Sequence, residues 1–437
     1  MKHLWNVPDD FWVIQQRARW ARTLRLFVDG EPERKGARGK RSAVTFQRQV
    51  LDRMAALRRR PFTGPVALDL AFHTARRNPP AIYQLAKHVL DLLGATDPAT
   101  QRGRRSVLYR DDRQVKFLYV GLRQTWSPDA AHDASAGWTG IVARPVRDVT
   151  ADLRLAHLLC SNDWPTQEDD ASPFWSPDLP DDVDRDRERP SGDPALWSWA
   201  EQFSVYFDRM RRQTSVLART DAVLLTGLCS YLDNLADSSP RRPGQWREAF
   251  EAVLHDSYRM SRHLLLSNPL TAPLPGLPRS AGDASTFVHG LREQLEDFRH
   301  RRPLFTSLVV PVTVTFLVIP PEQGKDLDNI ARVALPIVHD VFRPHIEPHL
   351  LSPQPCDEDA EPWRVEALRR LRSLNANSVA AYQVIELPRT PQDPPEGVLR
   401  LALGADSHGS WWDRAAAYVD KRIIDTDGFA GRGLPGW

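Results

Sequence analysis

Two segments of the chain repeat the same succession of signals, and this repetition restricts the fold more than any other feature. In residues 45–72 and again in residues 286–318, a Thr-Phe pair precedes apolar residues at helical spacing, then Arg-Arg-Pro and Phe-Thr, then an alternation of apolar residues. Spacings of three to four predict an amphipathic helix, and a period of two predicts a half-buried strand. Chance explains any one match, whereas their common order favours an internal duplication.

The likeness continues beyond these segments. Residues 84–93 predict a second helix that Gly94 closes, and residues 329–335 predict its counterpart, which Pro336 breaks or kinks. Further strands are predicted over residues 114–120, 139–143 and 379–387. Each copy therefore reads helix, strand, helix, strand.

The repeated elements predict an α+β fold in which an insert separates two modules. The first module takes residues 1–150, the insert 151–280 and the second module 281–405, and a C-terminal helix and tail take 406–437. An acidic, proline-rich loop, a helical region, a linker and the C-terminal helix are predicted over residues 168–193, 195–266, 269–278 and 411–424.

The cysteines and the apolar runs restrict the compartment. Cys160, Cys229 and Cys356 are isolated, which excludes a disulfide framework and a cysteine zinc site. The first residues lack the apolar run of a secretory signal, and the longest apolar run, residues 308–319, is too short to cross a bilayer. We expect a cytoplasmic protein with no membrane partner.

Charge is balanced overall but not along the chain. The formal net charge is +2, yet residues 1–125 hold 25 Lys and Arg against 11 Asp and Glu, whereas the remaining residues hold 33 against 45. Such asymmetry suggests a polyanion-binding face at one end of the chain, and DNA is the expected partner. The residues expected to contact DNA are Arg34, Lys35, Arg38, Lys40, Arg41, Arg104 and Arg105. Alternatively, these are solvated faces, and because only 7 of the 58 basic residues are Lys, the arginines reflect a GC-rich genome.

The Lys-Asp-Leu-Asp-Asn segment at residues 325–329 lies between a predicted strand and a predicted helix. Two carboxylates on a short turn at a strand end suit Mg²⁺ or Mn²⁺, which also accept water and substrate phosphate as ligands. Acidic residues equally serve as caps at helix starts, so Asp326 or Asp328 alone is compatible with a capping role.

A second acidic pair, Asp111-Asp112, stands immediately before the strand predicted at residues 114–120. A carboxylate at a strand entry is a candidate metal ligand. An aspartate pair is also typical of a tight turn, and this alternative stays open on the sequence alone.

Together the two motifs resemble the RusA family of Holliday junction resolvases. The likeness rests on Asp-Leu-Asp-Asn, on a basic residue four positions after the second Asp, and on Asp-Asp-x-Gln-Val leading into a strand. It covers Asp326, Asp328, Asn329 and Arg332 in the second copy, and Lys87, Asp111, Asp112 and Gln114 in the first. With the flanking elements it spans about half of the chain and excludes the insert and the tail.

The resemblance implies a fold, an activity and a role for each of these residues. Family members are small, dimeric, Mg²⁺-dependent endonucleases that cut branched DNA. It therefore implies two RusA-like modules, each a mixed sheet with helices on one face, in an intramolecular pseudo-dimer that acts alone or as a higher oligomer. It implies Mg²⁺ or Mn²⁺ at Asp326, Asp328 and Asp112, catalytic roles also for Asp111, Arg332 and Lys87, and a supporting role for Asn329.

Neither copy holds the complete set of acids. Aligning Lys87 with Arg332 sets Ala81, Tyr83 and Gln84 opposite Asp326, Asp328 and Asn329. In the other direction, Asp111 and Asp112 align with Ala376 and Asn377. The first copy has kept the basic residue and the Asp pair, and the second has kept Asp-Leu-Asp-Asn.

Two explanations of this complementary loss compete. In the first, the interface of the pseudo-dimer unites acids of both copies in one composite site, although in the family the ligands come together within one subunit fold. In the second, the chain is a decayed relative that binds DNA without cutting it. The acidic loop at residues 357–359 is either a local replacement for the lost pair or a solvated loop.

The insert provides a further, weaker alternative. Its helices are rich in Trp, Phe and Leu. Such residues are more often core than interface, but they also suit a docking surface for a protein partner.

Overall fold

The computed structural model describes residues 9–36, 40–76, 78–100, 105–124, 137–162, 199–237, 259–268, 270–276, 284–321, 327–343, 378–390, 393–406 and 409–426 of the 437-residue chain. The helices are α1 (Asp9–Arg22), α2 (Lys40–Ala56), α3 (Ile82–Leu93), α4 (Val146–Asn162), α5 (Trp199–Asp237), α7 (Ala284–His300), α8 (Leu327–Val341) and α10 (Trp411–Thr426), with a further helical stretch at residues 259–266. The strands are β1 (Leu24–Asp29), β2 (Val66–Thr74), β3 (Val115–Gln124), β4 (Trp138–Pro145), β5 (Thr271–Leu274), β6 (Val312–Ile319), β7 (Val379–Glu386) and β8 (Val398–Ala405).

All eight strands form one mixed sheet, whose order is β1-β4-β2-β3-β7-β6-β8-β5. The order reads the same from either edge: β1, β4, β2 and β3 in one half correspond to β5, β8, β6 and β7 in the other. The directions correspond as well, because β2 pairs with β3, and β6 with β7, in parallel, whereas the remaining neighbours are antiparallel. The two halves meet at β3 and β7.

The registers of the halves also agree. In the first half the pairing of β2 with β3 shifts by one residue immediately after Val66, which pairs with Val115. In the second half the pairing of β6 with β7 shifts immediately after Val312, which pairs with Val379. A shared irregularity at the same place gives a residue-by-residue correspondence between the halves.

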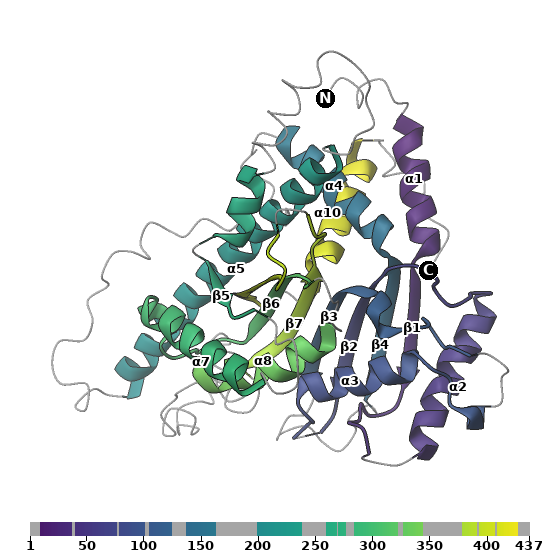
Figure 1. The fold of residues 1–437 in the computed structure, drawn as a ribbon, viewed down its shortest axis with the longest axis horizontal. Coiled ribbons are helices and arrows are strands. Elements are labelled where there is room, and N and C mark those ends of the chain that lie inside the picture. Colours follow the sequence, from purple (N-terminus) through teal and green to yellow (C-terminus); the bar gives the residue numbers. More distant parts are fainter. Residues whose placement is uncertain are drawn as a thin grey trace.

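The module helices α2, α3, α7 and α8 pack on one face of the sheet, in agreement with the expectation, whereas α4, α10 and the C-terminal part of α5, from the insert and the C-terminal region, pack on the other face. One apolar core joins the sheet to α2, α3, α7 and α8, and a second core on the opposite face joins it to α4 and α10. Helix α5 contributes to both, with Met210 and Leu217 in the first core and Leu224 and Leu228 in the second. In β2, β3, β6, β7 and β8 the side chains alternate between the two cores, as the pleat requires, whereas the core residues of β1, β4 and β5 all belong to the first core. Figure 1 shows α3 and α8 next to one another across the middle of the sheet.

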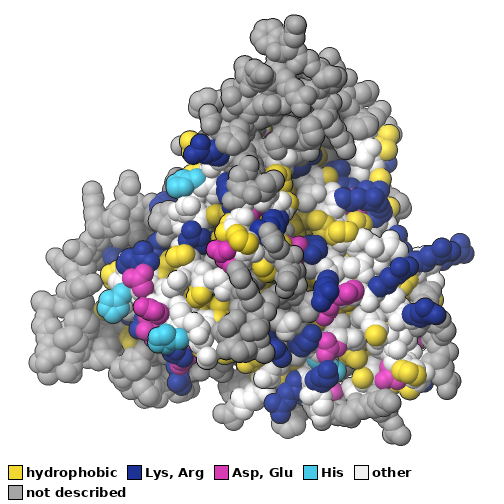
Figure 2. Space-filling model, viewed as in Figure 1, with side chains coloured by type: hydrophobic (Ala, Val, Ile, Leu, Met, Phe, Trp, Pro, Cys, Tyr) yellow, Lys and Arg dark blue, Asp and Glu magenta, His cyan; other side chains and the backbone are white. Residues whose placement is uncertain are grey.

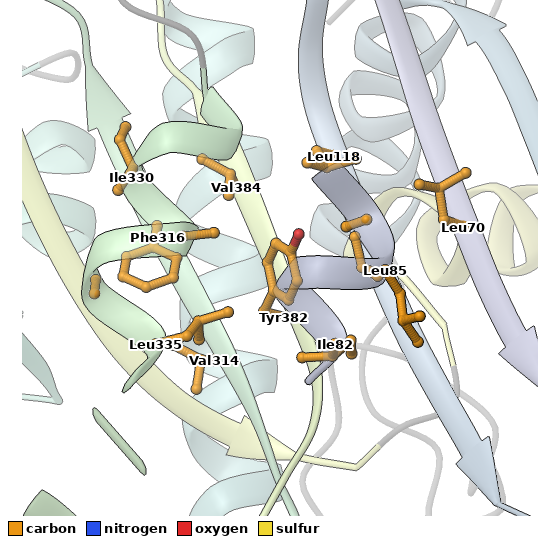
Figure 3. Packing of buried hydrophobic residues seen from close by; sticks show 14 of the residues in the cluster. Leu70, Ile82, Leu85, Leu118, Val314, Phe316, Ile330, Leu335, Tyr382 and Val384 are labelled. Carbon is orange, nitrogen blue, oxygen red and sulfur yellow. The ribbon is translucent and has the colours of Figure 1, made fainter. Parts of the chain in front are cut away.

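The middle of the first core lies between α3, α8 and the central strands. Ile82 and Leu85 of α3 approach Tyr382 of β7, while Ile330 of α8 lies above Val384 (Figure 3). The helical spacing of the buried residues of α3, at positions 82, 85, 86, 89, 90 and 93, presents one continuous apolar face to the sheet. These contacts tie the two halves together through helices as well as through the sheet.

The linker predicted over residues 269–278 is wrong, because it contains a strand. β5 pairs antiparallel with β8 and forms one edge of the sheet. Its four residues include Pro273, which is tolerated because an edge strand leaves one side of its backbone unpaired. β1 and β8 were not predicted either, whereas the strands now labelled β2, β3, β4, β6 and β7 and helix α10 confirm the sequence-based elements to within a few residues.

Of the helices in the described part of the chain, none combines the length and the apolar character needed to traverse a lipid bilayer.

The packing of α3 predicts a large effect of truncation at Leu85. Leu85 is 1 % exposed, whereas Leu57 is 52 % exposed. We expect Leu85→Ala to lower the free energy of unfolding by about 2–5 kcal/mol, because the cavity lies in a close-packed core. The matched Leu57→Ala change should alter it by less than about 1 kcal/mol. Urea unfolding of both variants measures the difference, and equal effects would contradict the core assignment.

Candidate functional site

The central strands decide which segments share an end of the sheet. Phe117 of β3 and Leu317 of β6 both pair with Ile385 of β7, so they stand at one level. β7 is antiparallel to β3 and parallel to β6. The start of β3 and the end of β6 therefore lie at the same end of the sheet, about 10 Å apart across β7.

This arrangement brings the two predicted half-motifs to one end. Asp111 and Asp112 precede β3. The Asp-Leu-Asp-Asn segment follows β6 in the sequence and leads into α8. We call this end, where Asp112 precedes β3 and α8 begins, the acidic end.

The directions of the helices agree with this placement. His339, late in α8, has its Nδ1 2.7 Å from the Ser378 hydroxyl, just before β7, so the C-terminal part of α8 lies at the opposite end. The C-terminal half of α3 lies at the acidic end, because the Tyr109 hydroxyl donates to the Leu90 carbonyl at 2.8 Å. The start of α8 and the second half of α3 therefore approach the same end.

Within one copy the half-motifs are far apart. Because β6 and β7 are parallel, the segment after β6 and the segment before β7 lie at opposite ends of an eight-residue strand, roughly 25 Å apart. The Asp111-Asp112 pair and the start of α8, which belong to different halves, share an end, whereas the two motif positions within one half lie at opposite ends.

The correspondence between the halves moves one alignment by a single position. Val115 corresponds to Val379, so counting back along the sequence sets residues 375–376, rather than 376–377, opposite residues 111–112. These are Asn375 and Ala376, which carry no carboxylate. The second copy therefore still lacks the acidic pair, although these residues and the loop at 357–359 lie outside the described residues.

At the acidic end Lys87 lies between the carboxylates of Asp91 and Asp112. Its ammonium lies 3.1 Å from a carboxylate oxygen of Asp91, one turn later in α3, and 3.8 Å from one of Asp112. Lys35 lies 3.0 Å from the other oxygen of Asp91. Burial alone would raise the pKa of Asp91, but hydrogen bonds from Lys35 and Lys87 outweigh it and hold that pKa below its usual range.

The sequence-predicted pair Asp111-Asp112 plays two different parts. Asp111 caps a short 3₁₀ turn by accepting a hydrogen bond from the Arg113 N–H at 2.9 Å, and this bond lowers the pKa of Asp111. The Gln114 side-chain oxygen accepts from the backbone N–H groups of Arg110 and Asp111, and its amide donates to the Gly64 carbonyl. The turn is thus held rigidly, and the other carboxylate, on Asp112, points to Lys87.

Two residues of the acidic end were missed by the sequence analysis. Lys116 of β3 and Glu386 of β7 form an ion pair at 2.7 Å across the junction of the halves. Glu386 ends a mainly apolar strand, and a charged residue in that position was the available signal. Its carboxylate adds to those of Asp91 and Asp112 at this end.

The structure describes only part of the Asp-Leu-Asp-Asn segment. Asp326 lies outside the described residues, and Asp328 is placed in the first turn of α8 without a described side chain. Asn329 is half-buried, and Arg332, one turn further along, is exposed. Among the side chains that the structure does describe, no three His, Cys, Asp or Glu are grouped closely enough to hold a metal ion.

At the opposite end, acids of the described chain lie next to arginines. Asp340, late in α8, lies 2.6 Å from Arg292. Glu31, which accepts a hydrogen bond from Thr74 at the end of β2, lies 3.8 Å from Arg76.

α3 begins after Ala81, and its first residues are Ile82, Tyr83 and Gln84, where α8 has Leu327, Asp328 and Asn329. The first turn of α3 therefore lacks the aspartate that α8 carries in its first turn.

Some of the predicted DNA-contacting residues border the acidic end. Lys35 pairs with Asp91, as described above, and exposed Arg105 follows the end of α3, its carbonyl accepting from the Thr96 N–H. Arg34 is exposed next to Lys35. In Figure 2 basic and acidic side chains lie next to one another over α3. Lys40 and Arg41 are placed only as the start of α2, and Arg38 and Arg104 lie outside the described residues.

A second group with a perturbed pKa lies on the other face of the sheet. Asp69 of β2 is fully enclosed, and burial, together with the nearby Asp413 carboxylate, raises the pKa of Asp69 to about 8. It accepts a hydrogen bond from the Ser410 hydroxyl at 2.9 Å, while its other oxygen has no hydrogen-bond partner. Strongly shifted acids often mark functional sites, but this one is sealed between β2 and α10.

Comparison with models of known protein families and with curated proteins found no match.

The environment of Asp69 predicts a pH-dependent stability. Its folded-state pKa lies above that of an exposed carboxyl group, so the native state binds the proton more tightly and loses stability as the pH rises from about 4 to about 8. We expect Asp69→Asn to remove this part of the loss, so that its free energy of unfolding falls less between pH 5 and pH 8.5. The exposed Asp29→Asn change serves as control in urea titrations. Parallel pH profiles for Asp69→Asn and the wild type would contradict the prediction.

Proposed function

We propose that the chain consists of two RusA-like modules that form an intramolecular pseudo-dimer and act as a metal-dependent endonuclease on branched DNA. One observation carries the proposal: the antiparallel pairing of β3 with β7 brings the segments kept by different copies to the same end of the sheet. Each copy has lost a different acidic motif, and the two remaining motifs can form one complete set of acids only if they lie at the same end of the sheet. The matching strand order, directions and registers of the two halves support the duplication.

The proposed site takes acids from both halves. Asp112, with Asp111 beside it, comes from the first copy, and Asp326 and Asp328 come from the second. Carboxylate oxygens are the ligands that Mg²⁺ and Mn²⁺ prefer, so the donor set fits such an ion. When bound, the ion would lower the pKa of water and stabilise negative charge on the phosphate.

The basic residues complete the site. Lys87 lies 3.8 Å from Asp112, and Arg332 is exposed one turn after Asp328. In the proposed reaction water adds to phosphorus, one bridging P–O bond breaks, and a proton of the water ends on the leaving oxygen as a hydroxyl group. These cations hold the scissile phosphate through charge-assisted hydrogen bonds. Asn329 orients the first turn of α8, and Lys35, Arg34 and Arg105 bind the flanking phosphates.

A non-catalytic DNA-binding protein on the same fold is the second candidate. It is favoured by the observation that the described acids have partners within the chain: Asp91 and Asp112 lie next to Lys87, and Asp111 caps a turn. This candidate predicts junction binding with a strong dependence on salt and no cleavage with any divalent ion.

The insert contributes mainly to the core. Leu224, Leu228 and Tyr231 of α5 are fully buried in the second apolar core. A protein-docking role of the insert therefore has less support than a structural one.

The composite site predicts that acids of both copies are needed for cleavage. We expect Asp112→Asn and Asp328→Asn each to lower Mg²⁺-dependent cleavage of a labelled four-way junction by about 100-fold or more, because each removes a metal ligand. Binding of the junction should persist. Asp340→Asn is the matched control, because Asp340 lies late in α8 and pairs with Arg292 at 2.6 Å. If Asp112→Asn cuts normally while Asp328→Asn does not, the site is confined to one copy.

A single composite site further predicts an unpaired incision. A symmetric two-site dimer cuts two strands of a junction, whereas this chain should nick one strand and leave the symmetry-related strand intact. Denaturing gels of junctions labelled on each strand in turn measure the pattern. Paired cuts at equal rates from a monomeric protein would show that the opposite end is also active.

A further inference from the structure

The two halves of the sheet differ in how the face that carries the second core is covered. In the first half this face exposes one side chain from each strand: Phe27 (β1), Trp138 (β4), His73 (β2) and Arg123 (β3). We call these four residues the aromatic platform. Phe27 is 52 % exposed, Arg123 is exposed, and Trp138 and His73 are partly exposed.

The strand registers make the aromatic platform continuous. Trp138 pairs with His73, and His73 pairs with Arg123, so these three stand in one row across the sheet. The Trp138 and His73 rings stack with centroids 3.6 Å apart and an interplanar angle of 14°, and the Phe27 ring meets Trp138 edge-on at 5.4 Å.

Small residues give these rings room to lie close to the sheet. The next row contains Gly140 between Phe27 and Ala71, and then Gly121. A Cβ atom at Gly140 would come within 2.9 Å of the Trp138 ring, so glycine lets the indole extend over this strand.

The second half of the sheet provides an internal comparison. The corresponding positions are Pro273, Val398, Ile319 and Leu387, none of which is aromatic or charged. Ile319 and Leu387 are buried in the second core together with side chains of α5 and of the helix at residues 259–266. Figure 1 shows α5 on the side of the sheet away from β1.

The helix that precedes β1 does not cover the first half in the same way. None of the described side chains of α1 belongs to either apolar core. Instead α1 is attached to α4 by ion pairs, from Arg19 to Asp152 at 2.6 Å and from Arg22 to Asp148 at 2.8 Å. None of the four platform residues belongs to either apolar core of the described chain, whereas their counterparts Ile319 and Leu387 do.

The charge next to the aromatic platform favours an anionic ligand. Arg123 lies at one end of the row, and Arg25, on β1, lies over the Trp20 ring at 4.9 Å. The acid at the other end, Asp29, is exposed and lies 3.5 Å from Arg53. Burial and the neighbouring Arg123 lower the pKa of His73, so the imidazole is neutral at pH 7 and offers an uncharged ring for stacking.

We propose that the aromatic platform binds single-stranded DNA, with unpaired bases stacking on Phe27 and Trp138 and the backbone following Arg123 and Arg25. Aromatic rings on an open sheet flanked by arginines are the combination that binds single strands without sequence preference. A duplex hides the faces of its bases and would not use the rings. The choice of DNA over RNA rests on the proposed function, in which an unpaired strand next to a branch is part of the substrate.

Binding of a fluorescein-labelled oligothymidylate 12-mer, followed by anisotropy in EDTA, tests the proposal without involving cleavage. We expect Phe27→Ala and Arg123→Ala each to weaken binding by about 10-fold. Phe27→Trp should retain affinity, because the stacking surface persists. Arg147→Ala is the control for loss of an exposed arginine, as Arg147 is 78 % exposed on α4. Thermal unfolding of each variant verifies that the fold is intact.

The outcomes separate this proposal from the proposed function. Unchanged affinity in both Phe27→Ala and Arg123→Ala, no binding of the wild type, or tighter binding of an oligouridylate 12-mer would overturn the aromatic platform as a DNA site. If the wild type does not cleave junctions but its binding of oligothymidylate depends on Phe27, the nuclease proposal is contradicted and the proposal for the aromatic platform is supported.

Discussion

The antiparallel pairing of β3 with β7 is the constraint on which the arrangement of this molecule depends. It joins two four-stranded halves into one sheet and sets them in opposite directions. As a result, the start of β3 and the end of β6 lie at the same end of the sheet, and α3 packs against α8 across the boundary between the halves. The acidic end follows from this pairing, since parallel strands at the boundary would have separated Asp112 from the start of α8.

Differences between the halves are as informative as their agreement. At the acidic end the first copy contributes Lys87 and Asp112 and the second contributes the start of α8, whereas the opposite end begins with Ile82 and Tyr83. On the other face, α5 packs on the aliphatic surface of one half, whereas α1, which ion pairs attach to α4, contributes no described side chain to either core. In both places the two halves present different side chains at corresponding positions.

The sequence predicted the elements that have strong periodicity. Strands β2 and β6 alternate clearly, and α3 has a regular apolar face, so local patterns were sufficient for them. β1 and β5 are short edge strands whose pairing partners lie more than 100 residues away, so no local signal identified them. The proximity of Lys87 to Asp112 was expected only from a resemblance, and the pair of Lys116 with Glu386 was not predicted, because it depends on the contact between two strands 270 residues apart.

Containment of both halves in one polypeptide has an evolutionary consequence. In a homodimer a single gene encodes both halves, so any replacement of an acid strikes both symmetry-related sites at once and is exposed to selection immediately. In the proposed fusion of two copies, each half is encoded separately and cannot exchange partners, because the continuous sheet holds its neighbour in place. Mutations can then accumulate in different motifs of each half, and selection needs to preserve only one intact combination.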